Sequence, residues 1–299
     1  MNKLIGMIGF GLIAKIHSKI MFENNYPIRC VLVRSEESIE KTKNFFVKEF
    51  SYTPLITNDY NFFFSKKIDI LLICSPPSTH YKFLLKAFDN NISVFCEKPL
   101  FWDKELGLEE FKNKISIIES HENKNFLVNT SNTYFLKSFL ANIKVKKIKY
   151  LKFIFHTNGS AKYQEISEDL LPHGLSILIE ILGFSNIKKI EKIILESHVN
   201  YKFRYSNAQV EFEFKEDPLI EKNMTIYINE HKFTRIQVGN NSNYRVSFRK
   251  EDGTILDNFE DPFRVYSKLF LKGYRQHEKD LYNLKLMNQI TKGFNEVKS

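Results

Sequence analysis

The stretch IGMIGFGLIAKIHS, residues 5–18, decides the fold of the first half of the chain. Residues 5–8 predict a short strand, and apolar residues at helical spacing after it predict a helix. Between the two stands a GxGxxA motif, whose glycines permit a tight turn and the close approach of a pyrophosphate, while its alanine lets the helix pack on the strand. The motif predicts a dinucleotide site, with a purely structural turn as the alternative; its residues are Gly9, Phe10, Gly11, Leu12, Ile13 and Ala14.

Strand and helix patterns alternate from this motif to about residue 129. Apolar strands are predicted at residues 28–33, 68–73, 92–96 and 126–129, with helical patterns between them. Alternation of this kind is typical of a parallel sheet with helices on both faces. We therefore predict an α/β protein whose residues 1–125 form a doubly wound Rossmann domain that binds NAD or NADP.

The pattern changes near residue 146. Residues 149–155, 199–205, 208–214 and 224–228 alternate between apolar and polar side chains. This period of two indicates an antiparallel sheet with one covered face and one exposed face. Residues 126–299 are therefore predicted to form an α+β domain with an open, mostly antiparallel sheet, interrupted by a helix at about residues 167–182.

Composition limits the classes of function. The three cysteines lie in apolar runs, and an odd number without paired spacing argues against a disulfide framework or a zinc site, so we expect no metal and a reducing cytoplasm. No secretory signal or membrane-spanning run is recognised. The net charge of +9 comes without a basic stripe interleaved with aromatic residues, so we expect no nucleic acid as a partner. Solvated surface lysines or an anionic small substrate would explain the charge.

The end of the second predicted strand should face the adenosine ribose of a dinucleotide. A carboxylate there would accept bonds from a free 2′-hydroxyl, whereas an arginine would suit a 2′-phosphate. Arg34 and Ser35 occupy this place and favour NADP over NAD. The alternative is that Arg34 stacks on the adenine or points into water and that Glu36 or Glu37 meets the ribose.

Residues 74–77, CSPP, follow the third long apolar strand. Two prolines at the carboxyl end of a strand make a rigid wall at the edge where ligands of such sheets bind. Ser75, Pro76 and Pro77 are therefore predicted to contact the cofactor. His80 follows at the start of a helix, where we expect mainly a structural role beside the same site.

The next strand is followed by Glu97, Lys98 and Pro99, which provide a carboxylate, an ammonium group and a proline ring. The proline restricts the lysine before it to extended geometry, which aims the ammonium group at the cofactor edge. There Lys98 can hydrogen-bond a substrate hydroxyl and favour its alkoxide, and Glu97 is placed at the cofactor. The alternative is a surface lysine at an ordinary turn.

Asp169 and His173 stand four residues apart in the predicted helix of the second domain, so both lie on one face. The carboxylate can orient the imidazole, and histidine suits the task of removing a hydroxyl proton while a hydride leaves the carbon. The alternative is an aspartate that complements the helix dipole and a histidine that packs beside Pro172.

The segments IGMIGFGLIAKIHS, IDILLICSPPSTHYKFLLKAF, ISVFCEKPL and EDLLPHGLSILIEILG resemble the family of glucose-fructose oxidoreductase, inositol dehydrogenase and MocA. The resemblance implies a Rossmann domain, a second domain whose open sheet often forms an oligomer interface, and a catalytic set of Lys98, Asp169 and His173. A homo-oligomer that uses the carboxyl-terminal sheet is therefore expected.

Two positions depart from the pattern of the family. Ser176 stands where many relatives carry a carboxylate three residues after the histidine. An arginine that many relatives carry after the last strand of the first domain is replaced within residues 128–134, where Asn129 and Tyr134 are candidates to take its place. Both departures concern substrate binding, so the substrate stays open.

The leading hypothesis is a cytoplasmic NAD(P)-dependent oxidoreductase that acts on a carbinol or ketone of a sugar, cyclitol or sugar nucleotide. Relatives that cleave glycosidic bonds with a transiently reduced cofactor provide an enzymatic alternative. A sensor protein that keeps the fold without catalysis is the alternative from another class.

Overall fold

The computed structural model describes residues 3–121, 123–141, 147–238 and 245–293. The chain divides into two compact units, each described by itself. Unit 1 comprises Met1–Asn129 and Tyr266–His277, and unit 2 comprises Thr130–Val265 and Glu278–Ser299.

Unit 1 contains a parallel sheet of six strands in the order β3-β2-β1-β4-β5-β6. This order reverses between β1 and β4, and in sheets of this type ligands bind at the carboxyl ends of the strands beside such a reversal. The strands, mostly apolar and, except for β3, largely buried, are β1 (Ile5–Ile8), β2 (Ile28–Leu32), β3 (Leu55–Thr57), β4 (Ile70–Ile73), β5 (Ser93–Cys96) and β6 (Phe126–Val128).

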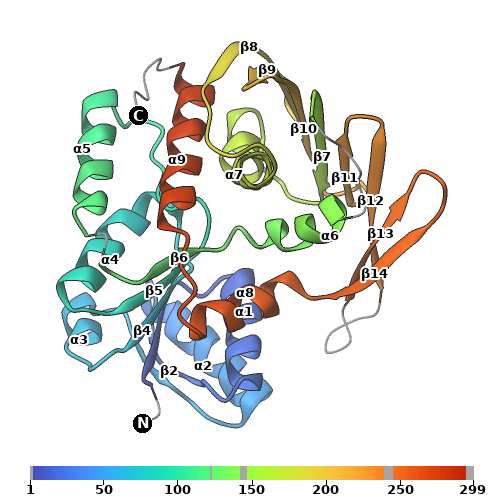
Figure 1. The fold of residues 1–299 in the computed structure, drawn as a ribbon. Helices are drawn as coiled ribbons and strands as arrows, with labels where there is room; N and C mark the ends of the chain where they lie inside the picture. The colour runs from blue at the N-terminus through green and yellow to red at the C-terminus, as the bar shows by residue number, and fades with distance from the viewer. Residues whose placement is uncertain (1–2, 122, 142–146, 239–244, 294–299) are drawn as a thin grey trace. The chain divides into compact units, whose positions relative to one another are not determined.

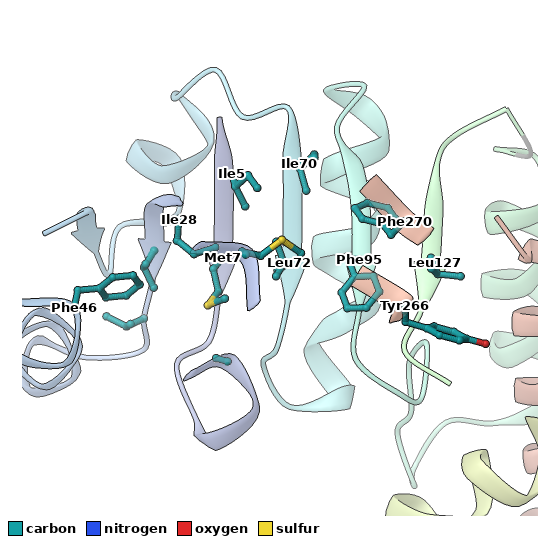
Figure 2. Packing of buried hydrophobic residues seen from close by; sticks show 14 residues of the cluster. Ile5, Met7, Ile28, Phe46, Ile70, Leu72, Phe95, Leu127, Tyr266 and Phe270 are labelled. Carbon is teal, nitrogen blue, oxygen red and sulfur yellow. The ribbon is translucent and has the colours of Figure 1, made fainter. Parts of the chain in front are cut away.

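Helices connect these strands, as the alternating pattern predicts. They are α1 (Leu12–Glu23), α2 (Glu36–Phe50), α3 (Tyr60–Phe64), α4 (Pro77–Asp89) and α5 (Leu108–Glu119). The core of unit 1 packs apolar residues of the strands against α1 and α2, and Figure 2 shows this cluster crossing the sheet from Phe46 through Met7 and Leu72 to Phe95 and Leu127.

A segment from near the carboxyl end of the chain completes this core. Helix α8 (Pro262–Leu271) contributes Tyr266 and Phe270, whose rings lie beside Phe95 and Leu127 in Figure 2. The ring centroids of Phe270 and Phe95 are 5.4 Å apart. Farther on, the ring of His277 stacks on Phe126 at 4.0 Å. The sequence pattern did not predict that residues 266–277 would join the first unit.

Unit 2 is built on a sheet of eight strands in the order β14-β13-β12-β11-β7-β10-β9-β8. All described neighbours pair antiparallel except β7 and β10, which pair parallel. The strands are β7 (Tyr150–Thr157), β8 (Ile187–Ile194), β9 (His198–Tyr205), β10 (Ala208–Glu216), β11 (Asn223–Ile228), β12 (His231–Val238), β13 (Arg245–Lys250) and β14 (Ile255–Glu260).

One face of this sheet is covered by α7 (Gln164–Leu182), as Figure 1 shows. The helix packs closely because Gly174 lacks a side chain: a Cβ there would lie 3.1 Å from ring atoms of both Phe212 and Phe214. The remaining helices of the unit are the short 3-10 helix η1 (Ser131–Phe135), α6 (Leu136–Ala141) and α9 (His277–Lys292).

The predicted fold class is confirmed: a doubly wound parallel sheet precedes a mixed, mostly antiparallel one. The helix predicted at residues 167–182 begins three residues earlier, at Gln164, and ends before Gly183, whose φ is 71°. No helix within the described ranges is long and apolar enough to cross a membrane.

Candidate active site

The glycine turn of unit 1 has the geometry that the motif predicts. Gly9 has a φ of 81°, and a Cβ on it would lie 2.8 Å from the carbonyl oxygen of Cys74 and from two backbone atoms of Ser75. Gly11 is the N-cap of α1 and is exposed, and a Cβ on it would meet no atom within 4 Å. No side chain caps the helix at this end, so the first N–H groups of α1 are open to an anionic ligand.

The other predicted cofactor residues follow β2 and β4, on either side of β1. Arg34 is exposed after β2, and Ser35 precedes α2 with its hydroxyl 3.0 Å from that of Ser38. After β4, Ser75 bonds the Thr79 hydroxyl at 2.7 Å, and Pro76 is exposed. Because carboxyl ends of neighbouring parallel strands meet at one edge of the sheet, these residues lie along the same edge as the glycine turn.

His80 lies beneath this edge. Its ring is fully buried, with Nε2 2.6 Å from the carbonyl oxygen of Ser75 and Nδ1 2.9 Å from that of Pro99. Burial lowers the pKa of His80, an effect that the bonds to the carbonyl groups of Ser75 and Pro99 oppose. The side chain therefore joins the loop after β4 to the loop after β5 and has no surface with which to touch a cofactor.

Glu97 is predicted from the sequence to contact the cofactor. In the structure its carboxylate binds other side chains of unit 1. His17 Nε2 lies 2.6 Å from Glu97 Oε1, and the same oxygen accepts a bond from Asn129 Nδ2 at 2.7 Å. His17 belongs to α1 and Asn129 follows β6, so Glu97 links three elements around the half-buried Lys98. The amide of Asn129, a candidate for substrate binding, is thus engaged with this carboxylate.

The partners of Glu97 favour its charged form by lowering the pKa of its carboxyl group. Burial raises its pKa, but the bonds from His17 and Asn129 and the charge of Lys98 outweigh burial and hold the pKa below the usual 4.5. A carboxylate whose pKa is lowered on folding stabilises the folded state above its unfolded pKa, and that stabilisation is lost as the pH falls through the folded pKa.

Glu97→Gln should therefore lower the free energy of unfolding at neutral pH by roughly 1.5 to 3 kcal/mol, the range for hydrogen bonds to charged groups. The difference from wild type should shrink as the pH falls below about 4.5. Urea unfolding at a series of pH values checks this, followed by the fluorescence of Trp102, the single tryptophan, which lies in unit 1. A difference that stays constant or grows in acid would contradict it.

The second part of the predicted site lies in unit 2, on α7. Asp169 is exposed, and His173 is half-buried four residues later on the same helix. The ring of Phe155 meets the imidazole edge-to-face, with centroids 5.4 Å apart. Asn132 Nδ2, from η1, lies 3.1 Å from His173 Nδ1.

Two further candidates for substrate binding lie in unit 2. The hydroxyl of Ser176 donates to the His173 carbonyl oxygen at 2.8 Å, within the helix. Tyr134 is partly exposed, and its ring contacts Phe135 and Phe259. Asn132 and His17 carry no sequence signal of a role here, because only the fold brings them to His173 and Glu97.

Comparison with known proteins gives three results. Residues 3–130 match the model of the family described as "Oxidoreductase family, NAD-binding Rossmann fold", GFO_IDH_MocA. The uncharacterized oxidoreductase YrbE of Bacillus subtilis strain 168 is 26% identical over 117 residues, which are 39% of this chain and 32% of that protein. The match therefore spans about a third of the length of this curated relative.

Solved structures resemble the chain over nearly its whole length. An oxidoreductase from Agrobacterium radiobacter, in complex with NAD+, L-tartaric acid and magnesium, has a TM-score of 0.71 at 15% identity and covers 98% of this chain and 96% of its own. UDP-N-acetylglucosamine 3-dehydrogenase from Acidithiobacillus ferrooxidans also has a TM-score of 0.71, at 13% identity, with 97% of each chain covered. At these identities the likeness establishes the fold.

The family match covers the residues that form the six-stranded sheet and the glycine turn. All three observations indicate a Rossmann fold that binds a dinucleotide. Over residues 3–130, the chain is therefore similar to the GFO/IDH/MocA family of oxidoreductases with an NAD-binding Rossmann fold.

Proposed function

We propose that the protein is an NAD(P)-dependent oxidoreductase acting on a carbinol or ketone of a sugar, cyclitol or sugar nucleotide. The observation that carries this proposal is the open amino-terminal end of α1 behind the Gly9 turn, on the sheet edge where Lys98 follows β5. A dehydrogenase of a nucleotide sugar and an NAD+ complex among proteins of the same fold support the class of substrate and cofactor.

The residues of unit 1 fit a dinucleotide. The exposed Gly11 leaves space for a pyrophosphate, and the uncapped N–H groups of α1 provide its donors. Ser75 and Pro76 would border the nicotinamide, and Arg34 would lie at the ribose. A bound nicotinamide would supply or accept the hydride, which no side chain of the chain can do.

In the proposed reaction, Lys98 and His173 together handle the hydroxyl proton of the substrate. Asp169 orients the imidazole of His173. An ammonium group stabilises an oxygen that gains negative charge as the carbon loses a hydride. The anchoring of Glu97 by His17 and Asn129 supports the role of Lys98, because it fixes the backbone from which the lysine extends.

Fluorescence titration with NADH and NADPH tests the cofactor site, and turnover with sugars, cyclitols and nucleotide sugars tests the reaction. Release of reduced cofactor in proportion to product would support net oxidation. Cleavage of a glycosidic bond without net reduced cofactor would indicate the alternative enzyme, and cofactor binding without turnover a sensor. Failure to bind either cofactor would refute the proposal.

We further propose that NADP is the preferred cofactor, through Arg34. The carboxylates that could instead meet a free ribose have partners within unit 1: Glu36 accepts a bond from Asn58 at 3.0 Å, and Glu37 pairs with Lys41 at 2.6 Å.

Arg34→Ala should raise the Kd for NADPH about tenfold or more, because it removes a charge-assisted contact with the 2′-phosphate, and should leave the Kd for NADH nearly unchanged. Arg29→Ala, at an exposed position of β2, is the matched control. Equal losses of affinity for both cofactors, or none for either, would remove Arg34 from this role.

A further inference from the structure

Tyr163 has a backbone conformation that its residue type rarely adopts. It is the N-cap of α7 in unit 2, with a φ of 51° and a ψ of −126°. The Glu165 N–H donates to the Lys162 carbonyl oxygen at 3.0 Å and closes a turn around it. These angles are those of the second position in a type II′ turn, where glycine is the usual residue because a side chain is strained there. A tyrosine at this place therefore lowers stability.

Three contacts hold this turn to the end of the sheet in unit 2. The Tyr163 N–H donates to the Glu196 carbonyl oxygen at 3.0 Å, and Lys162 Nζ lies 2.5 Å from Glu196 Oε1. The N–H of Ala161 donates at 2.8 Å to Oε2 of Glu216, a buried residue that ends β10. Partners outside the turn thus fix the strained conformation.

Packing of the Tyr163 side chain does not offset this strain. The side chain is 55% exposed. Among the residues that the structure describes, no aromatic ring contacts it and no group bonds its hydroxyl. A glycine would make the same backbone bonds without strain. Strained residues that the surrounding fold holds in place are found mainly at functional sites, so an exposed ring in this position indicates contact with a ligand.

The turn lies at the end of the sheet that also carries His173. The imidazole contacts the ring of Phe155, two residues before β7 ends at Thr157. Thr157 pairs with Glu216, the residue to which the turn is bonded. Along α7, ten residues separate Tyr163 from His173, which is about 15 Å at 1.5 Å per residue. This separation exceeds the width of one sugar ring and suits a sugar joined to a nucleoside diphosphate.

We propose that Tyr163 is a substrate-binding residue on which the base of a nucleotide sugar stacks while the sugar lies at His173. An aromatic side chain can stack on the planar face of every nucleobase, so the ring selects a nucleotide without selecting its base. The inference rests on the proposed function and deepens it, because it chooses the sugar nucleotide among the substrate classes.

Isothermal titration calorimetry tests this with UDP-N-acetylglucosamine, GDP-mannose, ADP-glucose and dTDP-glucose. Saturating reduced cofactor is present, because it fills the dinucleotide site and cannot oxidise the sugar. Wild type should bind at least one of the four. For that ligand, Tyr163→Gly and Tyr163→Ala should each raise the Kd about 5- to 150-fold, the range of base–aromatic stacking. Tyr163→Phe keeps the ring and should stay within about twofold of wild type.

The glycine and alanine variants separate binding from folding. Both remove the ring, but only glycine also relieves the strain at a φ of 51°. Tyr163→Gly should therefore unfold at a higher urea concentration than Tyr163→Ala, although both bind the nucleotide sugar equally weakly. Phe184→Ala is the matched control, since Phe184 follows the other end of α7 and is 45% exposed. Its Kd should equal that of wild type.

An unchanged Kd in Tyr163→Gly, or an equal loss of affinity in Phe184→Ala, would overturn the inference. Tyr163→Gly unfolding at a lower urea concentration than Tyr163→Ala would also overturn it, since the turn would then not be strained. Turnover of a free sugar or cyclitol without binding of any of the four nucleotide sugars would overturn the inference and leave the proposed function intact. Failure to bind either cofactor would refute the proposed function, and the same titrations without cofactor would still decide the role of Tyr163.

Discussion

Lys98→Met is expected to lower kcat at least about a thousandfold and to leave the Kd for NADPH within about twofold of wild type. Methionine keeps the length of the side chain and removes the ammonium group, so the substrate oxygen loses the charge that stabilises it. The neighbouring Glu97 stays anchored to His17 and Asn129, which preserves the loop. Stopped-flow measurement of hydride transfer and fluorescence titration with NADPH separate the two quantities.

Lys104→Met, at an exposed lysine in the loop that follows the same strand, is the control and should have wild-type activity. Turnover of Lys98→Met within a few-fold of wild type would remove Lys98 from the catalytic set. Loss of NADPH binding in this variant would instead show that the lysine belongs to the cofactor site.

Alanine at either glycine of the turn should weaken cofactor binding, but only alanine at Gly9 should also destabilise the fold. Gly9→Ala forces a positive φ on a residue with a side chain and places its Cβ 2.8 Å from backbone atoms of Cys74 and Ser75. Backbone strain and overpacking together should lower the free energy of unfolding by about 2 to 5 kcal/mol. Cofactor binding should be lost with the geometry of the turn.

Gly11→Ala meets neither obstacle, since its φ is −89° and no atom lies within 4 Å of the added Cβ. Stability should change by less than about 0.5 kcal/mol, while the Kd for the cofactor should rise at least about tenfold, because the methyl group stands where the pyrophosphate approaches the backbone. Urea unfolding and fluorescence titration of both variants check the pair. A stable Gly9→Ala protein, or unchanged affinity in Gly11→Ala, would contradict this account of the turn.

The parts that the sequence predicted well are those determined by local patterns. The strand, turn and helix around Gly9 follow from residue types within about ten positions, and the regular spacing of apolar strands was enough to predict the parallel sheet. The period of two also predicted the second sheet, although it could not show that β7 and β10 pair parallel, because alternation is the same in either direction.

Contacts between distant residues were not predictable. Glu97 looked like a cofactor ligand because it precedes Lys98, but its carboxylate bonds His17, 80 positions away, and Asn129, 32 positions away. Asn132 has no motif, and only the packing of η1 on α7 brings it to His173. Side-chain direction at the end of a strand depends on such partners, which a single sequence does not reveal.

The return of residues 266–277 to unit 1 has a consequence for biosynthesis. A ribosome makes the Rossmann strands first, yet Phe95 and Phe126 receive Phe270 and His277 only after residues 130–265 of unit 2 have been made. Until then these aromatic surfaces are without their final cover and are open to chaperones or to misassociation. The packing of the nascent amino-terminal unit is thus complete only once residues 266–277 have been made.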